Sequence, residues 1–349
     1  MPLITHRLRT TAAALACAGL LTACGASEAV PESAAATGGE QATEYPLVLD
    51  NCGTEVTVDA PPQRVVSLDQ GSTELMLSLG LGDRIVGTAS WTDPVLPSLA
   101  DANADVPRLA DNAPGYEAVL GTDPDFVTAS FGRHFATGGV AERARFTETG
   151  IGTYLSPTDC SGGQSVNAGG KRSEPLQVDA LYQEIRELAA VFDVPERGEQ
   201  LVAELQQRAA AATAEIEASG VTLGFWFADT RSPYFAGGVG APQLLAEGVG
   251  GANVFADLAD DWSAVSWEAV VDREPDVLVL GDLARDRFPG DRLADKEAFL
   301  AADPLTSTMQ AVQDQQYVAL SGAELNPSIR FVDGLEDLAA GLAELGRTS

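Results

Sequence analysis

Basic side chains are scarce in this sequence. Its 349 residues hold 21 lysines and arginines against 51 aspartates and glutamates, and only Lys171 and Lys296 are lysines. Nucleic-acid binding needs clustered basic side chains that meet the phosphates, so the composition argues against DNA or RNA as a partner. The excess of negative charge favours a soluble monomer, because like-charged molecules repel one another.

Motifs for catalysis and nucleotide binding are also absent. The sequence has no G-x-x-x-x-G-K-[ST] phosphate loop, no complete G-x-G-x-x-G fingerprint and no G-x-S-x-G nucleophile elbow. Apart from His6 near the N-terminus, the single histidine is His134, whereas zinc and manganese sites ordinarily need several converging ligands. We predict no catalytic residue, no metal site and no resident cofactor. A pair of carboxylates in a secreted hydrolase remains an alternative, since no spacing singles out a pair.

The N-terminus has no apolar run of the ~20 residues that a membrane-spanning helix requires. Residues 1–23 place Arg7 and Arg9 before a short apolar run, which is typical of a signal peptide. The run ends in Leu-Thr-Ala-Cys24, which resembles a bacterial lipobox, so we predict a lipid on Cys24; a plain signal peptide is the alternative. Residues 24–44 are small and polar without periodicity, which predicts a disordered, lipidated tether.

Cysteine is rare, with four in the chain. Cys17 would leave with the signal peptide and Cys24 would carry the lipid. Cys52 and Cys160 then form a single pair in an oxidising compartment, where a disulfide is the expected state. Two separate thiols are the alternative.

One ten-residue phrase occurs twice, as YEAVLGTDPD at 116–125 and as WEAVVDREPD at 267–276. Each copy predicts a short helix, a stop at proline and a buried strand. Before each copy, the order strand, helix, glycine turn and strand also repeats. We therefore predict an α/β fold of two Rossmann-like lobes with parallel sheets, at residues 45–177 and 220–349. A chance repeat is the alternative.

Residues 178–219 predict a helical linker between the lobes. Apolar residues keep helical spacing on both sides of an interruption at 193–195, and Glu196 to Ser219 has no internal proline. These 24 residues would span roughly 36 Å as a helix. One long rigid helix would limit the lobes to a small hinge or twist, with a ligand cleft between them.

Aromatic and basic residues follow the predicted strands. Residues just past the carboxyl ends of parallel strands line the ligand crevice of an open α/β sheet. Aromatic faces with a few arginines suit a large, partly apolar ligand that carries polar or anionic groups. The predicted ligand-binding residues are Trp91, Tyr116, Phe131, Arg133, His134, Trp226, Arg231, Tyr234, Trp262, Arg285 and Arg330. For each one, a place in the core or in an ion pair is the alternative, and Arg64 and Arg108 are expected to be structural.

Taken in order, these features resemble one family. The lipobox, RVVSL at 64–68, LGLGDRIVG at 79–87, the two repeated phrases, the linking helix and FLAADP at 299–304 are similar to the substrate-binding lipoproteins of ABC importers for ferric siderophores, haem and cobalamin. The resemblance covers roughly residues 45–345. It implies a protein on the extracytoplasmic face of the cell membrane, held there by its lipid alone, that delivers a small-molecule chelate to a permease dimer with its ATPase.

The resemblance also implies a role for the repeated phrase. In that family an exposed glutamate on each lobe docks onto arginines of the permease, and Glu117 and Glu268 occupy these positions here. A glutamate that only stabilises its own helix is the alternative. A ferric siderophore is the first expectation for the cargo, with haem, cobalamin or a deazaflavin-type cofactor precursor as alternatives. The loop at 156–175 and the Cys52–Cys160 pair are not general to the family, which leaves a specialised cargo open.

Overall fold

The computed structural model describes residues 42–348 except residues 215, 217 and 286. All of them lie in the compact unit formed by residues 40–349, one of two units into which the chain divides. The predicted signal peptide, Cys24 and the tether up to residue 41 lie outside the described residues. Within the described part, every helix is too short or too polar to cross a bilayer.

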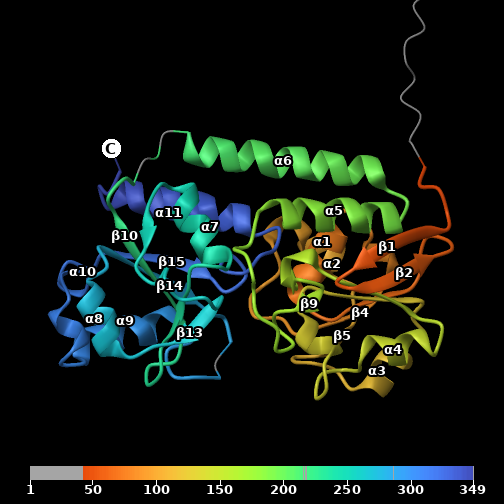
Figure 1. The fold of residues 1–349 in the computed structure, drawn as a ribbon, viewed down its shortest axis with the longest axis horizontal. Coiled ribbons are helices and arrows are strands. Elements are labelled where there is room, and N and C mark those ends of the chain that lie inside the picture. Colours follow the sequence, from red (N-terminus) through yellow and green to blue (C-terminus); the bar gives the residue numbers. More distant parts are fainter. Residues whose placement is uncertain (1–41, 215, 217, 286, 349) are drawn as a thin grey trace, which may run out of the picture. The chain divides into compact units, whose positions relative to one another are not determined.

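The N-terminal lobe contains a five-stranded parallel sheet with helices on both faces (Figure 1). Its strand order is β5 (Arg108–Ala110), β4 (Ile85–Ala89), β3 (Val65–Ser67), β6 (Phe126–Ala129) and β7 (Gly152–Leu155). The helices around it are α1 (Gln70–Ser78), α2 (Ala100–Asn103), α3 (Tyr116–Leu120), α4 (Arg143–Thr147) and α5 (Asp179–Val191). Neighbouring strand residues point to opposite faces, so Phe126 enters the core beneath α1 and α5, whereas Val127 enters the core beneath α3 and α4.

The C-terminal lobe contains a six-stranded mixed sheet. The strand order is β13 (Trp262–Ala264), β11 (Tyr234–Ala236), β10 (Thr222–Ala228), β14 (Val277–Asp282) and β15 (Tyr317–Ser321), and β12 (Ala252–Asn253) also pairs with β10. The helices of this lobe are α7 (Ala241–Gly248), α8 (Trp267–Arg273), α9 (Leu293–Ala302), α10 (Gln310–Gln313) and α11 (Phe331–Glu344). Strands β10, β12, β14 and β15 are parallel as predicted, whereas β11 and β13 add an antiparallel extension that the sequence analysis did not anticipate.

The two lobes repeat one unit, as the sequence predicts. In the first lobe β3 lies between β4 and β6, and in the second β10 pairs with both β12 and β14, all in parallel. The helices after the central strands, α1 and α7, are followed by Gly80 at φ +71° and Gly250 at φ +73°. Glycine adopts this left-handed conformation readily, and it ends a helix there. The repeated order in the sequence therefore corresponds to the same arrangement of parallel strands, helix and glycine turn in both lobes.

Helix α6 (Pro195–Thr213) lies along one side of both lobes, over α5 and α11 (Figure 1). Val202 and Leu205 are buried in a core cluster to which residues of both lobes belong. Arg208 forms ion pairs with Asp333 and Glu336 on α11. The helix ends at Thr213, six residues before the expected end at Ser219, so its 19 residues span roughly 28 Å rather than 36 Å. The linker therefore consists of two helices, of which α5 packs within the N-terminal lobe.

A hairpin of β1 (Leu47–Asn51) and β2 (Thr54–Val58) begins the N-terminal lobe. Cys52, in its turn, is bonded to Cys160, which opens a two-stranded ribbon of β8 (Cys160–Ser161) and β9 (Gln164–Ser165). The Asn51 side chain accepts from the Leu155 main-chain N–H and donates to the Leu155 carbonyl, both at 2.8 Å. The disulfide and this amide together attach the hairpin to the region just after β7.

The Cys52–Cys160 bond closes a segment of 108 residues. In the chain-entropy model, a cross-link of this span stabilises by about 4–5 kcal/mol because it restricts the unfolded chain, although engineered cases often give less. We expect the Cys52→Ser/Cys160→Ser double variant to unfold at a clearly lower urea concentration than the oxidised protein, measured by tryptophan fluorescence. Dithiothreitol should lower the midpoint of the parent protein to that of the variant and leave the variant unchanged. Equal midpoints for variant and oxidised parent would contradict the prediction.

Candidate functional site

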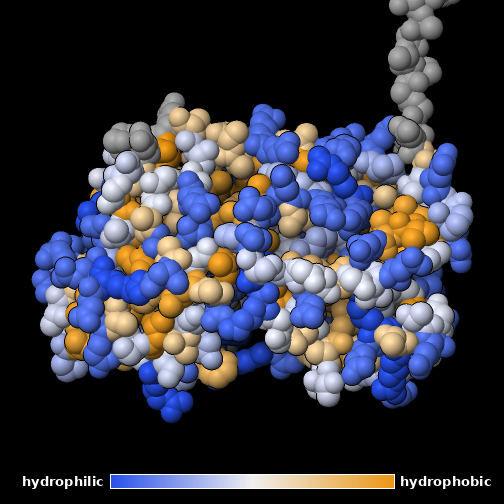
Figure 2. Space-filling model, viewed as in Figure 1, coloured by the Kyte–Doolittle hydropathy of each residue, from blue (hydrophilic) through white to orange (hydrophobic). Residues whose placement is uncertain are grey.

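A cavity of about 690 Å³ lies between the lobes. Residues that follow the carboxyl ends of strands in both sheets line it, among them Gln70, Ser90, Phe131, Asp229, Arg285 and Asn326. Figure 2 shows the gap between the lobes on the side away from α6, bordered by hydrophilic surface. The cavity is therefore placed where an open α/β sheet ordinarily receives a ligand.

The structure gathers seven of the eleven predicted ligand-binding residues at this region. Five line the cavity itself, namely Phe131, Arg133, Tyr234, Trp262 and Arg285. Trp91 and His134 line an adjoining cavity of about 500 Å³, which also includes Arg133 and Arg285. Within the main cavity, the Arg133 guanidinium lies 4.2 Å from the centre of the Phe131 ring. The walls thus combine flat apolar surfaces with cationic groups, and both kinds of surface can contact one large ligand.

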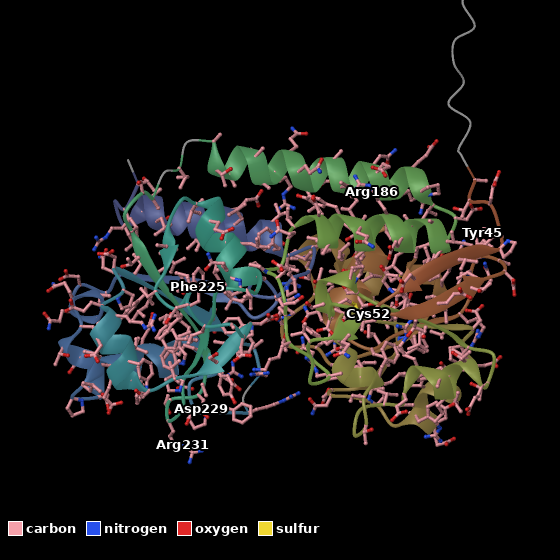
Figure 3. The ribbon with its side chains drawn as sticks, in the orientation of Figure 1. Tyr45, Cys52, Arg186, Phe225, Asp229 and Arg231 are labelled. Carbon is pink, nitrogen blue, oxygen red and sulfur yellow. A yellow bond between two sulfur atoms is a disulfide. The ribbon has the colours of Figure 1, made fainter. Side chains whose placement is uncertain are left out.

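Three predicted ligand-binding residues lie away from both cavities. Trp226 is completely buried in the C-terminal lobe, with the ring centre of Trp267 at 4.8 Å. Tyr116 is buried in the N-terminal lobe against Phe146, with ring centres 5.2 Å apart. Arg231 is exposed at the tip of its loop and points away from the lobe (Figure 3). The two aromatic residues serve the cores beneath α8 and α3, so these three residues leave the candidate ligand-binding set.

Arg330 is a fourth residue that leaves the set, because it joins the lobes. Its Nε donates to Glu74 Oε2 at 2.7 Å, and its terminal nitrogen contacts Glu74 Oε1 and donates to the Pro94 carbonyl at 2.5 Å. Glu74, on α1 of the other lobe, is completely buried, and Arg330 is 6 % exposed. Burial alone would lower the pKa of Arg330, but the hydrogen bond and the charge of Glu74 raise it. The guanidinium is therefore committed to a structural ion pair between the lobes.

Two further polar contacts join the lobes beside the cavity. The buried Arg172 donates to both carboxylate oxygens of Asp261, at 2.7 and 2.9 Å, and to the Thr158 carbonyl at 2.8 Å. In the C-terminal lobe, the main-chain N–H of Ala323, in the loop after β15, donates to Asp93 of the N-terminal lobe at 2.9 Å. Because paired charges that are withdrawn from water are costly to separate, these contacts favour the closed arrangement of the lobes.

The buried acids at the cavity are already hydrogen-bonded within the protein. Asp69 caps α1 through the Ser72 N–H at 3.1 Å and also accepts from the Ser130 N–H at 2.7 Å. Asp159 accepts from the Gly132 N–H at 2.8 Å. These carboxylates hold the loops after β3, β6 and β7 in place. Asp159 also accepts from the side chains of Ser165 and Asn167.

The arginines at the cavity have fewer partners. Among the residues that the structure describes, Arg133 and Arg287 have no carboxylate within ion-pair distance, whereas Arg285 lies 3.4 Å from Asp291. The Arg133 side chain is open to the cavity, and the surrounding walls lower the pKa of its guanidinium by limiting its hydration. A local positive charge therefore exists inside a protein with a strongly negative total.

Burial keeps two further ionisable groups neutral near the cavity. Burial lowers the pKa of His134 to about 4, although Asp69 acts in the opposite direction. Burial raises the pKa of Glu184 on α5 to about 8, and the Ser156 hydroxyl hydrogen-bonds to it at 2.6 Å. Within residues 42–348 apart from the three gaps, no three His, Cys, Asp or Glu side chains are grouped so as to hold a metal. The arrangement suits ligand binding by hydrogen bonds and charge.

The sequence analysis missed several residues at the cavity. Arg287 and Phe288 share the loop after β14 with Arg285, and all three line the cavity. The basic-acidic-basic-aromatic run at 285–288 directly after a predicted strand was a readable signal. The pairing of Arg172 with Asp261 was not readable, because the two residues lie 89 positions apart.

The repeated helices expose their glutamates. Glu117 lies in the first turn of α3 with its side chain 86 % exposed, and its nearest cation is Arg145 at 3.9 Å. Glu268 lies in the first turn of α8, where the Ser266 hydroxyl caps the helix, and it is also exposed. Both helices lie in the half of the molecule opposite α6, one in each lobe (Figure 1). Both carboxylates are therefore accessible to a partner.

Comparisons with known proteins agree with this architecture. A family model described as periplasmic binding protein matches residues 65–323. A vitamin B12-binding protein of Vibrio campbellii is 26 % identical over 223 residues, which cover 63 % of this chain and 71 % of the relative. A solved structure from Saccharomonospora viridis, described as an ABC-type Fe³⁺-hydroxamate transport system, has a TM-score of 0.70 at 26 % identity and covers 86 % of this chain and 99 % of that one. The periplasmic haem-binding protein RhuT from Roseiflexus sp. RS-1 has a TM-score of 0.60 at 22 % identity, covering 81 % and 98 %.

The structural role of Arg330 can be tested directly. The Arg330→Met substitution leaves the buried Glu74 carboxylate without its partner, and such a loss typically destabilises by about 3–5 kcal/mol. We expect a decrease of this size in the free energy of unfolding, measured with urea, and a partial recovery in the Glu74→Gln/Arg330→Met double variant. Arg231→Met removes the same charge from the surface and should change the free energy by less than about 0.5 kcal/mol. An Arg330→Met protein as stable as this control would refute the structural role.

Proposed function

Because the chain belongs to the periplasmic binding protein family, we propose that it captures a ferric siderophore outside the cytoplasm and delivers it to an ABC importer. Members of the family are binding proteins rather than enzymes, which sets aside the secreted hydrolase. The observation that carries the proposal is the cavity between the lobes. It has aromatic walls and two arginines, Arg133 and Arg287, that have no carboxylate within ion-pair distance among the described residues.

The dimensions and chemistry of the cavity support a large chelate. The main cavity of about 690 Å³ and the adjoining one of about 500 Å³ together offer room for a ligand larger than a sugar or an amino acid. Ferric siderophores are bulky and rich in oxygen acceptors, which arginine recognises through its planar set of donors. The Saccharomonospora viridis structure, described as part of a Fe³⁺-hydroxamate transport system, supports the same class of ligand.

Cobalamin is the second candidate. The Vibrio campbellii relative is a vitamin B12-binding protein, and its match extends over most of the present two-lobe unit. Flat aromatic walls such as Phe131 and Trp262 would contact the face of a corrin ring as well as they contact a hydroxamate chelate. Haem and a deazaflavin-type cofactor precursor would use the same walls and belong in the same binding experiment.

Delivery would depend on the N-terminal segment of the chain and on the two exposed glutamates. The signal peptide and the lipid on Cys24 would place the protein on the extracytoplasmic face, with residues 24–44 as a tether. Membrane contact would then occur through the lipid alone. The permease dimer, driven by its ATPase, would receive a monomer of this protein through Glu117 and Glu268, one carboxylate for each subunit.

The ligand class can be determined by native mass spectrometry of the purified protein with ferric siderophores, haem, cobalamin and flavins. We expect a one-to-one complex with a ferric siderophore, quenching of tryptophan fluorescence because Trp262 lines the cavity, and no chemical change of the ligand. A complex with cobalamin alone would replace the first candidate by the second. If no member of the panel is retained, the chelate-binding function is wrong.

The docking role predicts a separation of binding from transport. The Glu117→Arg/Glu268→Arg variant should bind the identified ligand with unchanged affinity, because both side chains lie outside the cavity, and should abolish its uptake by cells. The Glu204→Arg/Glu247→Arg variant makes the same charge change at exposed positions on α6 and α7 and should transport normally. Normal uptake by the first variant would remove the docking role and leave ligand binding untouched.

A further inference from the structure

Buried polar atoms without partners collect around the smaller cavity, which we name the side pocket and define by Ser90, Trp91, Arg133, His134, Arg285 and Arg287. The Ser90 hydroxyl oxygen, both ring nitrogens of His134 and Nε of Arg285 are buried and form no hydrogen bond among the described residues. Arg285 Nε lies 3.4 Å from Asp291 Oδ2, within ion-pair distance but without hydrogen-bond geometry. Buried polar groups are ordinarily paired, because burial removes their hydration without replacing it. Four such atoms at one pocket indicate a ligand group that accepts hydrogen bonds there.

The charges around the side pocket favour an anion. Arg133, Arg285 and Arg287 all line it. Burial lowers the pKa of Arg133, the charges of Asp69 and Asp159 oppose this, and the charges of Arg285 and Arg287 lower it further. The carboxylates that act on Arg133 already accept hydrogen bonds within the protein. Asp69 accepts from main-chain N–H groups, and Asp159 accepts from main-chain N–H groups and from the side chains of Ser165 and Asn167. Among the described residues that line the side pocket, three are arginines and none is a carboxylate, so positive charge is available there for an anion.

His134 contributes hydrogen bonding rather than charge. It is 2 % exposed, and its Nε2 lies 3.7 Å from Asp69, beyond hydrogen-bond distance. In its neutral form one ring nitrogen donates and the other accepts. A polar side chain this well buried needs a partner, and the side pocket that it lines is where such a partner would lie.

The loops that enclose the side pocket leave space in it. Gly138 and Gly169 line the pocket at φ +88° and +100°, conformations that other residues rarely adopt. A side-chain carbon added at either position would meet no atom within 4 Å. The space at the edge of the side pocket therefore depends on the backbone conformation of these two glycines.

We propose that the side pocket binds a terminal oxyanion, a carboxylate or a phosphate, of the ligand whose body occupies the main cavity. The two cavities share Ser90, Thr92, Arg133, Asn167, Arg285 and Arg287, so one ligand can extend through both. Arg133 and Arg287 supply the opposite charge, and Arg285 Nε and the Ser90 hydroxyl donate hydrogen bonds. The inference rests on the proposed function for the ligand body and adds a chemical class, a bulky ligand with an anionic arm.

Matched pairs of ligands test the anionic arm and distinguish its two chemical sources. Haem and its dimethyl ester differ in two carboxylates, and flavin mononucleotide and riboflavin differ in one phosphate. Binding is measured by calorimetry and tryptophan fluorescence at constant ionic strength, together with inorganic phosphate and citrate alone. We expect the anionic member of at least one pair to bind at least tenfold more tightly than its neutral partner, and the pair concerned identifies carboxylate or phosphate.

Variants locate the effect in the side pocket. Arg133→Gln/Arg287→Gln should reduce the affinity for the anionic ligand at least tenfold. The affinity for the neutral partner should fall by a clearly smaller factor, because both arginines also line the main cavity. Arg231→Gln, which removes an exposed arginine outside both cavities, should change neither. Urea unfolding serves as the control for folding. All variants should unfold near the midpoint of the parent protein, because Arg133 and Arg287 are exposed.

The outcomes separate this proposal from the proposed function. If the charged and neutral members of each ligand pair bind equally well, the anion site is wrong. If no member of either pair binds, the anion site is wrong when inorganic phosphate and citrate also fail to bind. A ferric siderophore or cobalamin that still binds then leaves the main function standing. Conversely, binding of phosphate or citrate that is lost in Arg133→Gln/Arg287→Gln, with no complex from the whole chelate panel, supports the anion site and refutes the proposed chelate.

Discussion

The packing of α6 against both lobes is the constraint on which the site depends. Val202 and Leu205 belong to a core cluster that includes residues of both sheets, and the Arg208 ion pairs attach the same helix to α11. This layer fixes the distance between the sheets, so the carboxyl ends of their central strands lie on either side of one cavity. A large separation of the lobes would expose this apolar layer to water, at ~25 cal/mol for each Å² uncovered. The helix therefore favours small changes around a nearly preformed site.

The arginines between the lobes differ in whether a carboxylate of the other lobe pairs with them. Arg330 and Arg172 each face a carboxylate of the other lobe, Glu74 and Asp261, and they act as structural links. Arg133 also approaches buried acids, but main-chain N–H groups engage those acids first, so its charge remains available to a ligand. The same residue type thus joins the lobes at two places and, in the proposed function, recognises cargo at a third. The difference lies in the carboxylate that each guanidinium meets.

The sequence predicts local and repeated features well, because they depend on neighbours in the chain. The two repeated lobes follow from short patterns, and seven of the eleven predicted ligand-binding residues line the two cavities. Residues whose roles depend on distant partners could not be assigned. Arg330 meets Glu74 across 256 positions, and Trp226 packs beneath a helix whose position only the folded sheet determines. An aromatic residue at a strand end fits a core as well as a cleft, so pattern alone does not separate these roles.

The negative total charge of the protein is compatible with an anionic cargo, because surface carboxylates and the arginines of the side pocket would act on it over different distances. At physiological ionic strength, exposed charges are screened beyond ~8 Å, so most surface carboxylates have little effect on a ligand inside the cavity. The arginines around the side pocket act at contact distance, where the walls limit water and the effective dielectric constant is low. The formal charge of −30 would therefore slow the approach of an anion at low salt without weakening the bound state. Affinity would be set by Arg133 and Arg287, which have no carboxylate within ion-pair distance in the described part of the chain, while the acidic surface favours solubility.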